Sequence, residues 1–112
     1  MPYLSVRVGL RLEAAQKEKL KAGFGQLITI IPGKTEADLM LDIQDGPLYM
    51  GGELVPCAYI DLRVYTKTTG EAKKRFTVAA CALIAAECGI PVERQYLTVC
   101  EFENWGYDGE WH

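Results

Sequence analysis

Histidine, long basic runs and long apolar runs are nearly absent from this sequence of 112 residues. The only histidine is the last residue, His112, and an imidazole at a chain end prone to fraying is a poor base for Ser-His-Asp or Cys-His catalysis. No stretch approaches the roughly 20 apolar residues of a membrane span, and no charged segment followed by an apolar run opens the chain. These absences exclude imidazole-based hydrolysis and membrane insertion, and they predict a cytoplasmic protein.

The spacing of the cysteines argues against a metal site. They are Cys57, Cys81, Cys88 and Cys100, and no two of them form a C-x-x-C pair. We therefore expect free, reduced thiols and no metal. Glycine-rich phosphate loops are missing as well, because Gly23-x-Gly25 falls in the middle of a predicted helix. No nucleotide or other cofactor is expected.

The charge balance excludes a further class of partner. Twelve Lys and Arg face fifteen Asp and Glu, a net charge of −3, and the longest basic cluster is Lys73-Lys74-Arg75. Proteins that bind nucleic acid carry extended basic surfaces, so no nucleic-acid partner is expected. The apolar share of 49% and the charged share of 24% are those of a globular protein. This length and composition predict one domain over residues 1–112.

The chain contains an internal repeat without gaps. Aligning Tyr3 with Tyr59 places the segment 3–8 on 59–64, and both alternate apolar with polar residues as strands do. The same alignment superposes two apolar helix faces spaced i, i+4, i+7, i+8: Leu20, Phe24, Leu27 and Ile28 on Phe76, Ala80, Leu83 and Ile84. The first half of each copy is therefore predicted to be a strand followed by a helix.

The second half of each copy completes a β-α-β unit. The alignment pairs Gly33 with Gly89, both predicted as helix C-caps, and then pairs the strand-like segments 39–43 and 95–99. Strand-helix-strand connections are right-handed and return the second strand parallel to the first. The sequence therefore predicts an α+β fold, in which two tandem β-α-β units form a four-stranded mixed sheet with two helices on one face.

The boundaries of these units follow from the repeat. The two copies span residues 2–46 and 58–102, a glycine- and proline-rich linker over 45–53 connects them, and a tail covers 103–112. The face of the sheet without helices is predicted to carry exposed aromatic and apolar side chains among polar ones: Tyr3, Met40, Tyr59, Tyr65 and Tyr96. Such a patch favours self-association, and a solvated sheet face is the alternative.

Pro2 is the remaining candidate for acid–base chemistry. A small second residue is of the kind that permits removal of Met1, which leaves a free secondary amine. Burial lowers the pKa of an amine, so this nitrogen would be neutral and basic near pH 7, as general-base catalysis requires. The alternative is a proline that begins a strand and whose nitrogen has no chemical role.

These features together resemble the tautomerase superfamily, in particular the branch of macrophage migration inhibitory factor and D-dopachrome tautomerase. The resemblance depends on Met1-Pro2 opening into a strand, the Pro32-Gly33-Lys34 turn, the Gly51-Gly52-x-x-x-Pro56-Cys57-Ala58 segment and the duplication. It implies a cofactor-independent keto–enol tautomerase that acts on a small α-keto carboxylate such as phenylpyruvate. It also implies a homotrimer with its active sites at subunit interfaces.

The resemblance assigns roles to single residues. Pro2 matches the general base, Lys34 matches the lysine that binds the substrate carboxylate, and the backbone N–H of Tyr65 helps to hold the same group. Tyr96 matches a tyrosine that reaches into the site of the neighbouring subunit. Thr98 stands where the branch has an asparagine, which implies a different substrate preference.

Other departures leave alternatives open. Arg11 lies near, but not on, the arginine position of the 4-oxalocrotonate branch, so a dicarboxylate substrate is only weakly indicated. The tail aromatics, Trp105, Tyr107 and Trp111, have three interpretations: they cross a subunit boundary, roof the pocket, or plug the core. The alternative to an enzyme is a cytokine-like or binding protein that retains a vestigial tautomerase pocket, because a fold does not determine function.

Overall fold

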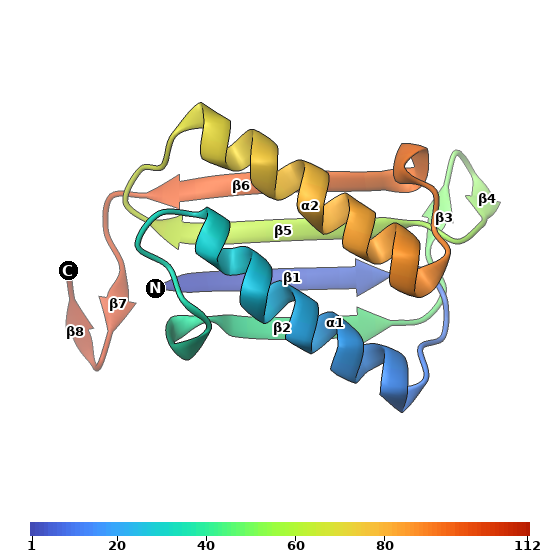
Figure 1. Ribbon diagram of the computed structural model, residues 1–112, viewed down its shortest axis with the longest axis horizontal. Helices are drawn as coiled ribbons and strands as arrows, with labels where there is room; N and C mark the ends of the chain where they lie inside the picture. Colours follow the sequence, from blue (N-terminus) through green and yellow to red (C-terminus); the bar gives the residue numbers. More distant parts are fainter.

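The computed structural model describes residues 1–112 and places two helices against one face of a four-stranded sheet (Figure 1). The helices are α1 (Ala14–Leu27) and α2 (Gly70–Cys88). The strands are β1 (Pro2–Val8), β2 (Met40–Asp45), β3 (Tyr49–Met50), β4 (Glu53–Leu54), β5 (Ala58–Tyr65), β6 (Gln95–Phe102), β7 (Gly106–Tyr107) and β8 (Glu110–Trp111). Three 3₁₀ turns complete the chain: η1 (Ile28–Ile30), η2 (Glu36–Asp38) and η3 (Val92–Arg94).

The sheet has the strand order β2-β1-β5-β6. Strands β1 and β2 are parallel, as are β5 and β6, whereas β1 and β5 run antiparallel in the centre. Each parallel pair is joined through one helix, which makes two β-α-β units related by the sequence repeat. The predicted fold class, a mixed sheet with two helices on one face, is therefore confirmed.

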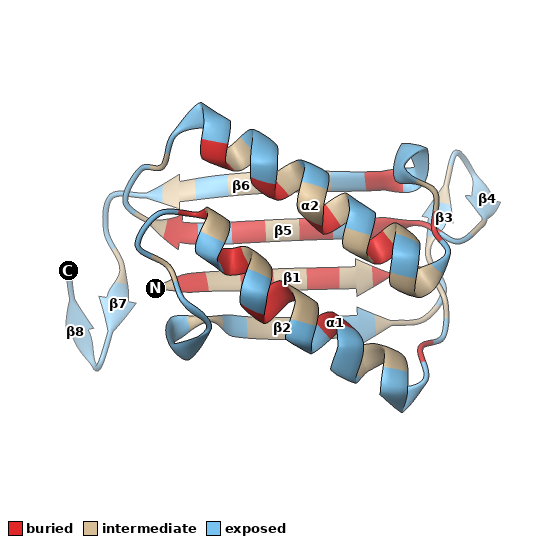
Figure 2. Ribbon diagram, in the orientation of Figure 1, coloured by how far each residue is buried: buried red, intermediate tan, exposed pale blue.

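The core lies between the helices and the two central strands (Figure 2). Alternate side chains of β1 and β5 point into it, and all are buried: Leu4, Val6, Val8, Ile60, Leu62 and Val64. The predicted helix faces meet them. Phe24 of α1 and Phe76 of α2 are fully buried, whereas Leu27 and Leu83 are only partly so. Truncating either phenylalanine to alanine would cost about 3–5 kcal/mol of unfolding free energy.

Only one of the two predicted glycine caps is a helix cap. Gly89 ends α2 in the left-handed region, with φ of 69°. Helix α1 instead ends at Leu27 and continues into the 3₁₀ turn η1, so the assignment of Gly33 as a C-cap is wrong. Gly33, with φ of 79°, is part of a β-turn in which the Lys34 N–H donates to the Ile31 carbonyl at 3.1 Å. A Pro-Gly pair at the centre of a turn is typical of type II geometry.

The helix-free face of the sheet is open, as the sequence predicted. Met40 is 68% exposed, Tyr96 65% and Tyr59 40%. Neither outer strand, β2 nor β6, has a neighbour on its far side within the chain. The predicted linker, 45–53, includes all but the last residue of the small β3–β4 hairpin, which lies at the end of the sheet away from the N-terminus (Figure 1). Neither helix is long and apolar enough to cross a membrane.

Candidate active site

The start of β1 lies between two segments that are distant in sequence. Pro2 is the first residue of the strand, is buried, and pairs with Val64 of β5. In the structure its nitrogen is an amide, because Met1 precedes it. The carbonyl of Met1 accepts a hydrogen bond from the Tyr65 N–H at 3.3 Å. The backbone donor that the resemblance assigns to a substrate carboxylate is thus adjacent to the predicted base.

Lys34 reaches the same place from the other side. The Ile31–Lys34 turn follows η1 and directs the lysine side chain toward the end of β5, where its ammonium donates to the Tyr65 carbonyl at 3.1 Å. Lys34 is half-buried. The structure therefore brings together three of the predicted site residues, Pro2, Lys34 and Tyr65, although they lie far apart in the sequence.

The surroundings of the N-terminus favour a neutral amine. Burial lowers the pKa of the Met1 amino group, and the nearby positive charge of Lys34 lowers it further. The Asp38 carboxylate opposes these two effects and raises the pKa, but the net direction is downward. A depressed pKa keeps an amine in its basic, unprotonated form closer to neutral pH. Pro2 follows Met1 directly and lines the same pocket as Asp38, and its nitrogen becomes the terminal amine when Met1 is removed.

A pocket of about 450 Å³ opens beside the N-terminus. Its walls come from the first three residues of the chain, from Ala37 and Asp38 around η2, from Met40, and from residues 105–108 of the C-terminal tail. The volume is within the usual range for a small-molecule site. The tail aromatics Trp105 and Tyr107 are among these lining residues, which agrees with the interpretation of the tail as a roof over the pocket, whereas Trp111 does not line it.

The tail forms a hairpin that holds this roof in place. Trp105 and His112 exchange two backbone hydrogen bonds, of 3.1 and 3.0 Å, at the open end of the β7–β8 pair. At the turn, Asp108 and Gly109 both have positive φ, 55° and 72°. An Asp-Gly pair in this conformation forms the tight two-residue turn that connects antiparallel strands. Figure 1 shows the hairpin beyond the end of the sheet, near the N-terminus.

Glu101 is a contributor to the site that the sequence analysis missed. It accepts hydrogen bonds from the Thr68 N–H at 2.5 Å and from the Lys73 ammonium at 2.7 Å. The segment it fixes begins at Thr66, whose φ of 72° is unusual for a residue other than glycine and whose N–H donates to Phe102. The repeat aligns Glu101 with Asp45, but no motif revealed that it holds the Tyr65 loop.

Two predicted residues lie elsewhere in the chain. Tyr96 and Thr98 are near the start of β6, where Tyr96 pairs with Tyr59, whereas the end of β5 next to Pro2 pairs with the end of β6. The Thr98 hydroxyl is hydrogen-bonded to Tyr59 and donates to Asp61, both at 2.7 Å. Their assigned roles require a site on a neighbouring subunit and remain predictions.

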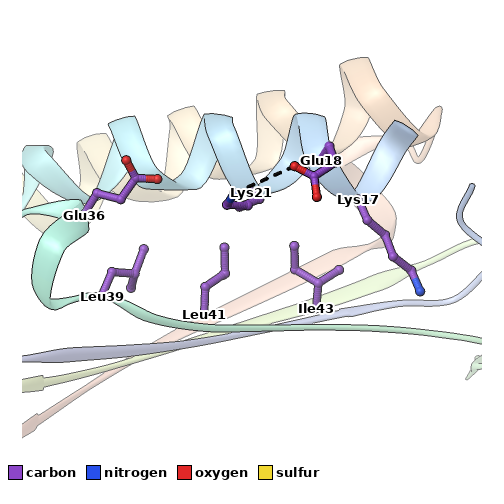
Figure 3. Close-up of a pocket in the computed structure, with 7 residues that line it drawn as sticks. All are labelled: Lys17, Glu18, Lys21, Glu36, Leu39, Leu41 and Ile43. Carbon is purple, nitrogen blue, oxygen red and sulfur yellow. Dashed lines mark ion pairs between the residues drawn. The ribbon is translucent and has the colours of Figure 1, made fainter. Parts of the chain in front are cut away.

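A second cavity, of about 610 Å³, lies between α1 and β2 (Figure 3). Its floor consists of Leu39, Leu41 and Ile43, whose side chains point toward the helix. Above them, the Lys21 ammonium is paired with Glu18 at 3.8 Å. None of the predicted site residues lines this groove, whereas Pro2 lines the N-terminal pocket. We therefore place the candidate active site at the start of β1.

Comparison with known proteins decides the family. The family model for macrophage migration inhibitory factor matches residues 1–110. The chain belongs to the macrophage migration inhibitory factor family. No group of three or more His, Cys, Asp or Glu side chains that could hold a metal ion occurs in the structure. No curated protein sequence matches the chain.

Solved structures of the same fold include members of this family from several organisms. The MIF2 protein of Leishmania major is 28% identical, with a TM-score of 0.89 over 100% of this chain and 97% of that one. The MIF-like protein of Entamoeba histolytica is 19% identical, with a TM-score of 0.87 over 99% and 98%. Pt0534 inactivated by 2-oxo-3-pentynoate is 17% identical, with a TM-score of 0.86 over 96% and 93%. The latter two comparisons establish the fold alone.

Proposed function

We propose that the protein is a cofactor-independent keto–enol tautomerase that acts on a small α-keto carboxylate of the phenylpyruvate type, with the nitrogen of Pro2 as general base. Family membership supports the class of chemistry. One structural neighbour, Pt0534, is inactivated by 2-oxo-3-pentynoate, which is itself an α-keto carboxylate. We extend that substrate class to this chain as part of the proposal.

The observation that carries the proposal is the contact between Met1 and Tyr65. The Tyr65 N–H donates to the Met1 carbonyl, and the Met1 amine lies beside Lys34. Removal of Met1 therefore has two effects at one place. It converts the Pro2 nitrogen from an amide to an amine, and it takes away the acceptor of the Tyr65 N–H. A backbone donor without an acceptor next to a lysine is suited to receive a carboxylate.

The proposed reaction moves one proton. Lys34 and the Tyr65 N–H hold the substrate carboxylate, which places the carbon next to the ketone close to Pro2. The neutral Pro2 amine takes a proton from that carbon, the carbon–hydrogen electron pair forms the enolate, and the protonated amine or water delivers a proton to the ketone oxygen. No atom or electron is gained or lost. Trp105 and Tyr107 cover the aromatic end, and Tyr96 of a neighbouring subunit in the proposed homotrimer completes the site.

The first experiment measures the intact mass and the turnover of the same preparation. We expect the mass of the chain without Met1, turnover of phenylpyruvate, and loss of that turnover after covalent modification of the N-terminal amine. Retained Met1, or a processed chain without turnover, would contradict the proposal. Either result would favour the second candidate, a binding protein that retains the pocket.

A further inference from the structure

Opposite charges lie on two sides of the N-terminus. The Lys34 ammonium is close enough to lower the pKa of the amine, and the Asp38 carboxylate is close enough to raise it. Lys34 donates to Tyr65, on the side of β5, whereas Asp38 lines the pocket itself. A second carboxylate, Asp108, lines the same pocket from the C-terminal hairpin. The pocket therefore has two acidic residues in its wall, whereas the Lys34 ammonium lies outside its lining, beside the end of β5.

Neither carboxylate is paired with a cationic side chain. The ion pairs of the chain involve other acidic residues: Asp45, Glu18, Asp61 and Glu101. Asp108 occupies the left-handed position of the hairpin turn, which Asp and Asn tolerate better than other side chains. Asp38 ends η2, and its N–H donates to the Thr35 carbonyl at 3.2 Å. Their negative charges are thus not neutralised by a neighbouring side chain.

We infer that the pocket prefers keto acids with a single carboxylate and an uncharged aromatic end, and that Asp38 and Asp108 select against dicarboxylates. The inference rests on the proposed function for the placement of the first carboxylate at Lys34. A second carboxylate in the pocket would meet two like charges, whereas an uncharged ring would be able to pack against Trp105 and Tyr107. Arg11, which the sequence offered for a dicarboxylate, is exposed beyond the opposite end of β1.

The test compares two substrates of the same shape. Phenylpyruvate and para-carboxyphenylpyruvate differ by one negative charge at the far end of the ring. We expect the processed protein to have a kcat/KM about tenfold lower for the dicarboxylate. Each of the two exposed carboxylates is expected to lower kcat/KM about threefold, and the two effects multiply to about tenfold. Asp108→Asn and Asp38→Asn should each reduce this discrimination about threefold, and the double variant should nearly abolish it.

The ratio of the two kcat/KM values reports only the effect of the additional carboxylate on the substrate. Replacing Asp38 also changes the pKa of the amine, but this change affects both substrates equally and cancels in the ratio. Asparagine retains the left-handed preference of Asp108, so the hairpin turn is preserved. Glu110→Gln is the matched control, because it removes one negative charge from the same hairpin at a residue that does not line the pocket. It should leave the ratio unchanged.

Binding of unreactive analogues separates this inference from the proposed function. Cinnamate and para-carboxycinnamate can be compared by calorimetry whether or not the protein turns over a keto acid. The inference is supported if the parent protein binds cinnamate more tightly than para-carboxycinnamate, and if this difference in affinity becomes smaller in Asp108→Asn and Asp38→Asn. The difference should also become smaller at about 1 M salt, which screens the two charges. Equal affinity for both acids, or a preference that both variants leave intact, overturns it. If the protein binds cinnamate selectively but turns over no keto acid, the proposed function is wrong and the charge selection still holds.

Discussion

The chemistry proposed here depends on whether the nitrogen of Pro2 is an amide or an amine. An amide nitrogen has no basic lone pair, so the same side chain in the same buried position is inert before Met1 is removed and a base afterwards. Sequence alone identified this residue because so few other bases are present. The structure adds that the nitrogen lies next to a lysine and a backbone donor, which an idle strand-initiating proline would not require.

Replacing Pro2 tests its role directly. Pro2→Gly keeps a small second residue that permits removal of Met1, but it supplies a primary amine on a more flexible residue. We expect kcat/KM for phenylpyruvate to fall by about 10²- to 10⁴-fold, the usual contribution of general acid–base catalysis, with an unchanged oligomeric mass. Pro56→Gly, at an exposed position between β4 and β5, is the control. Full activity of Pro2→Gly would show that the proline is not the base.

The pH dependence of the rate should respond to the two charges near the amine in opposite directions. Lys34 lowers the pKa of the Met1 amine and Asp38 raises it, and we expect the two charges to act with the same signs on the Pro2 amine of the processed chain. The base works only when it is unprotonated, so the rate falls as the pH drops through that pKa. Lys34→Met should therefore move the acidic limb of the kcat/KM profile to higher pH and raise KM about tenfold, since a charge-assisted carboxylate contact is lost.

Replacing Asp38 tests the direction of the pH shift, because its charge acts on the amine with the opposite sign to that of Lys34. Asp38→Asn should move the same limb to lower pH. Lys74→Met removes a lysine on the exposed face of α2 and should leave the profile in place. Shifts of the Lys34 and Asp38 variants in the same direction would contradict this electrostatic account.

Among secondary-structure elements, the loop between β5 and α2 connects the fold to the site. It directly follows Tyr65, the last residue of β5, and Glu101 of β6 anchors it through Thr68 and through Lys73 in the first turn of α2. The Lys73 hydrogen bond, followed by the Thr68 N–H, lowers the pKa of Glu101. Because the folded-state pKa is depressed, this stabilisation is complete above the unfolded-state pKa and is lost as the pH falls through the folded-state value.

Glu101→Gln should weaken this anchor. We expect a lower Tm at pH 7, and the difference from the parent protein should disappear in acid, where the parent carboxylate is also protonated. KM for phenylpyruvate should rise about threefold to tenfold with little change in kcat, because a looser Tyr65 loop holds the carboxylate less well. Glu103→Gln, on an exposed residue of the following segment, is the control. An unchanged KM would leave Glu101 with a purely structural role.

The order of the elements was predictable from the sequence because alternation and helical periodicity are local signals that occur twice. Gly89 and the buried faces of α1 and α2 followed from the repeat. Gly33 did not, because Pro32 and the 3₁₀ turn η1 replace the last turn of the first helix. The β7–β8 hairpin was also missed, although Asp108-Gly109 is a recognised turn signal, since the aromatic residues around it were interpreted without their turn.

The site was less predictable because it depends on contacts between distant segments. Pro2 and Lys34 were found through their chemistry and a family resemblance. Glu101, Asp38 and Asp108 were missed, since single acidic residues in loops carry no sequence signal of what they face. Only the register that places the end of β6 beside the end of β5 brings Glu101 to the Tyr65 loop.

For the whole molecule, the open sheet face and the free outer edges of β2 and β6 leave much surface without a partner. Exposed apolar and aromatic groups such as Met40, Tyr59 and Tyr96 favour association. Tyr96 lies at the end of the sheet away from Pro2, so in one isolated chain it has no part in the reaction. A homotrimer with cyclic symmetry would bring it to the pocket of the next subunit.

Mixing two inactive variants tests this arrangement. Pro2→Gly retains Tyr96, and Tyr96→Ala retains Pro2, so neither variant alone forms a complete site. If each site combines Pro2 of one subunit with Tyr96 of the next, then unfolding and refolding an equal mixture should restore activity. Random assembly gives a complete pair at about a quarter of all sites, and we expect about a quarter of the parent activity per subunit.

Light scattering of each variant should first give three times the mass of the chain, so that recovered activity reflects exchange of subunits and not assembly by one partner. A mixture that is never unfolded, with its subunits still separate, is the negative control. Recovery near zero after refolding would show that Tyr96 does not act at a neighbouring Pro2. A Tyr96→Ala protein that is fully active alone would show the same. Recovery well above the activity of either variant requires a site shared between subunits, because no single chain in the mixture carries both residues.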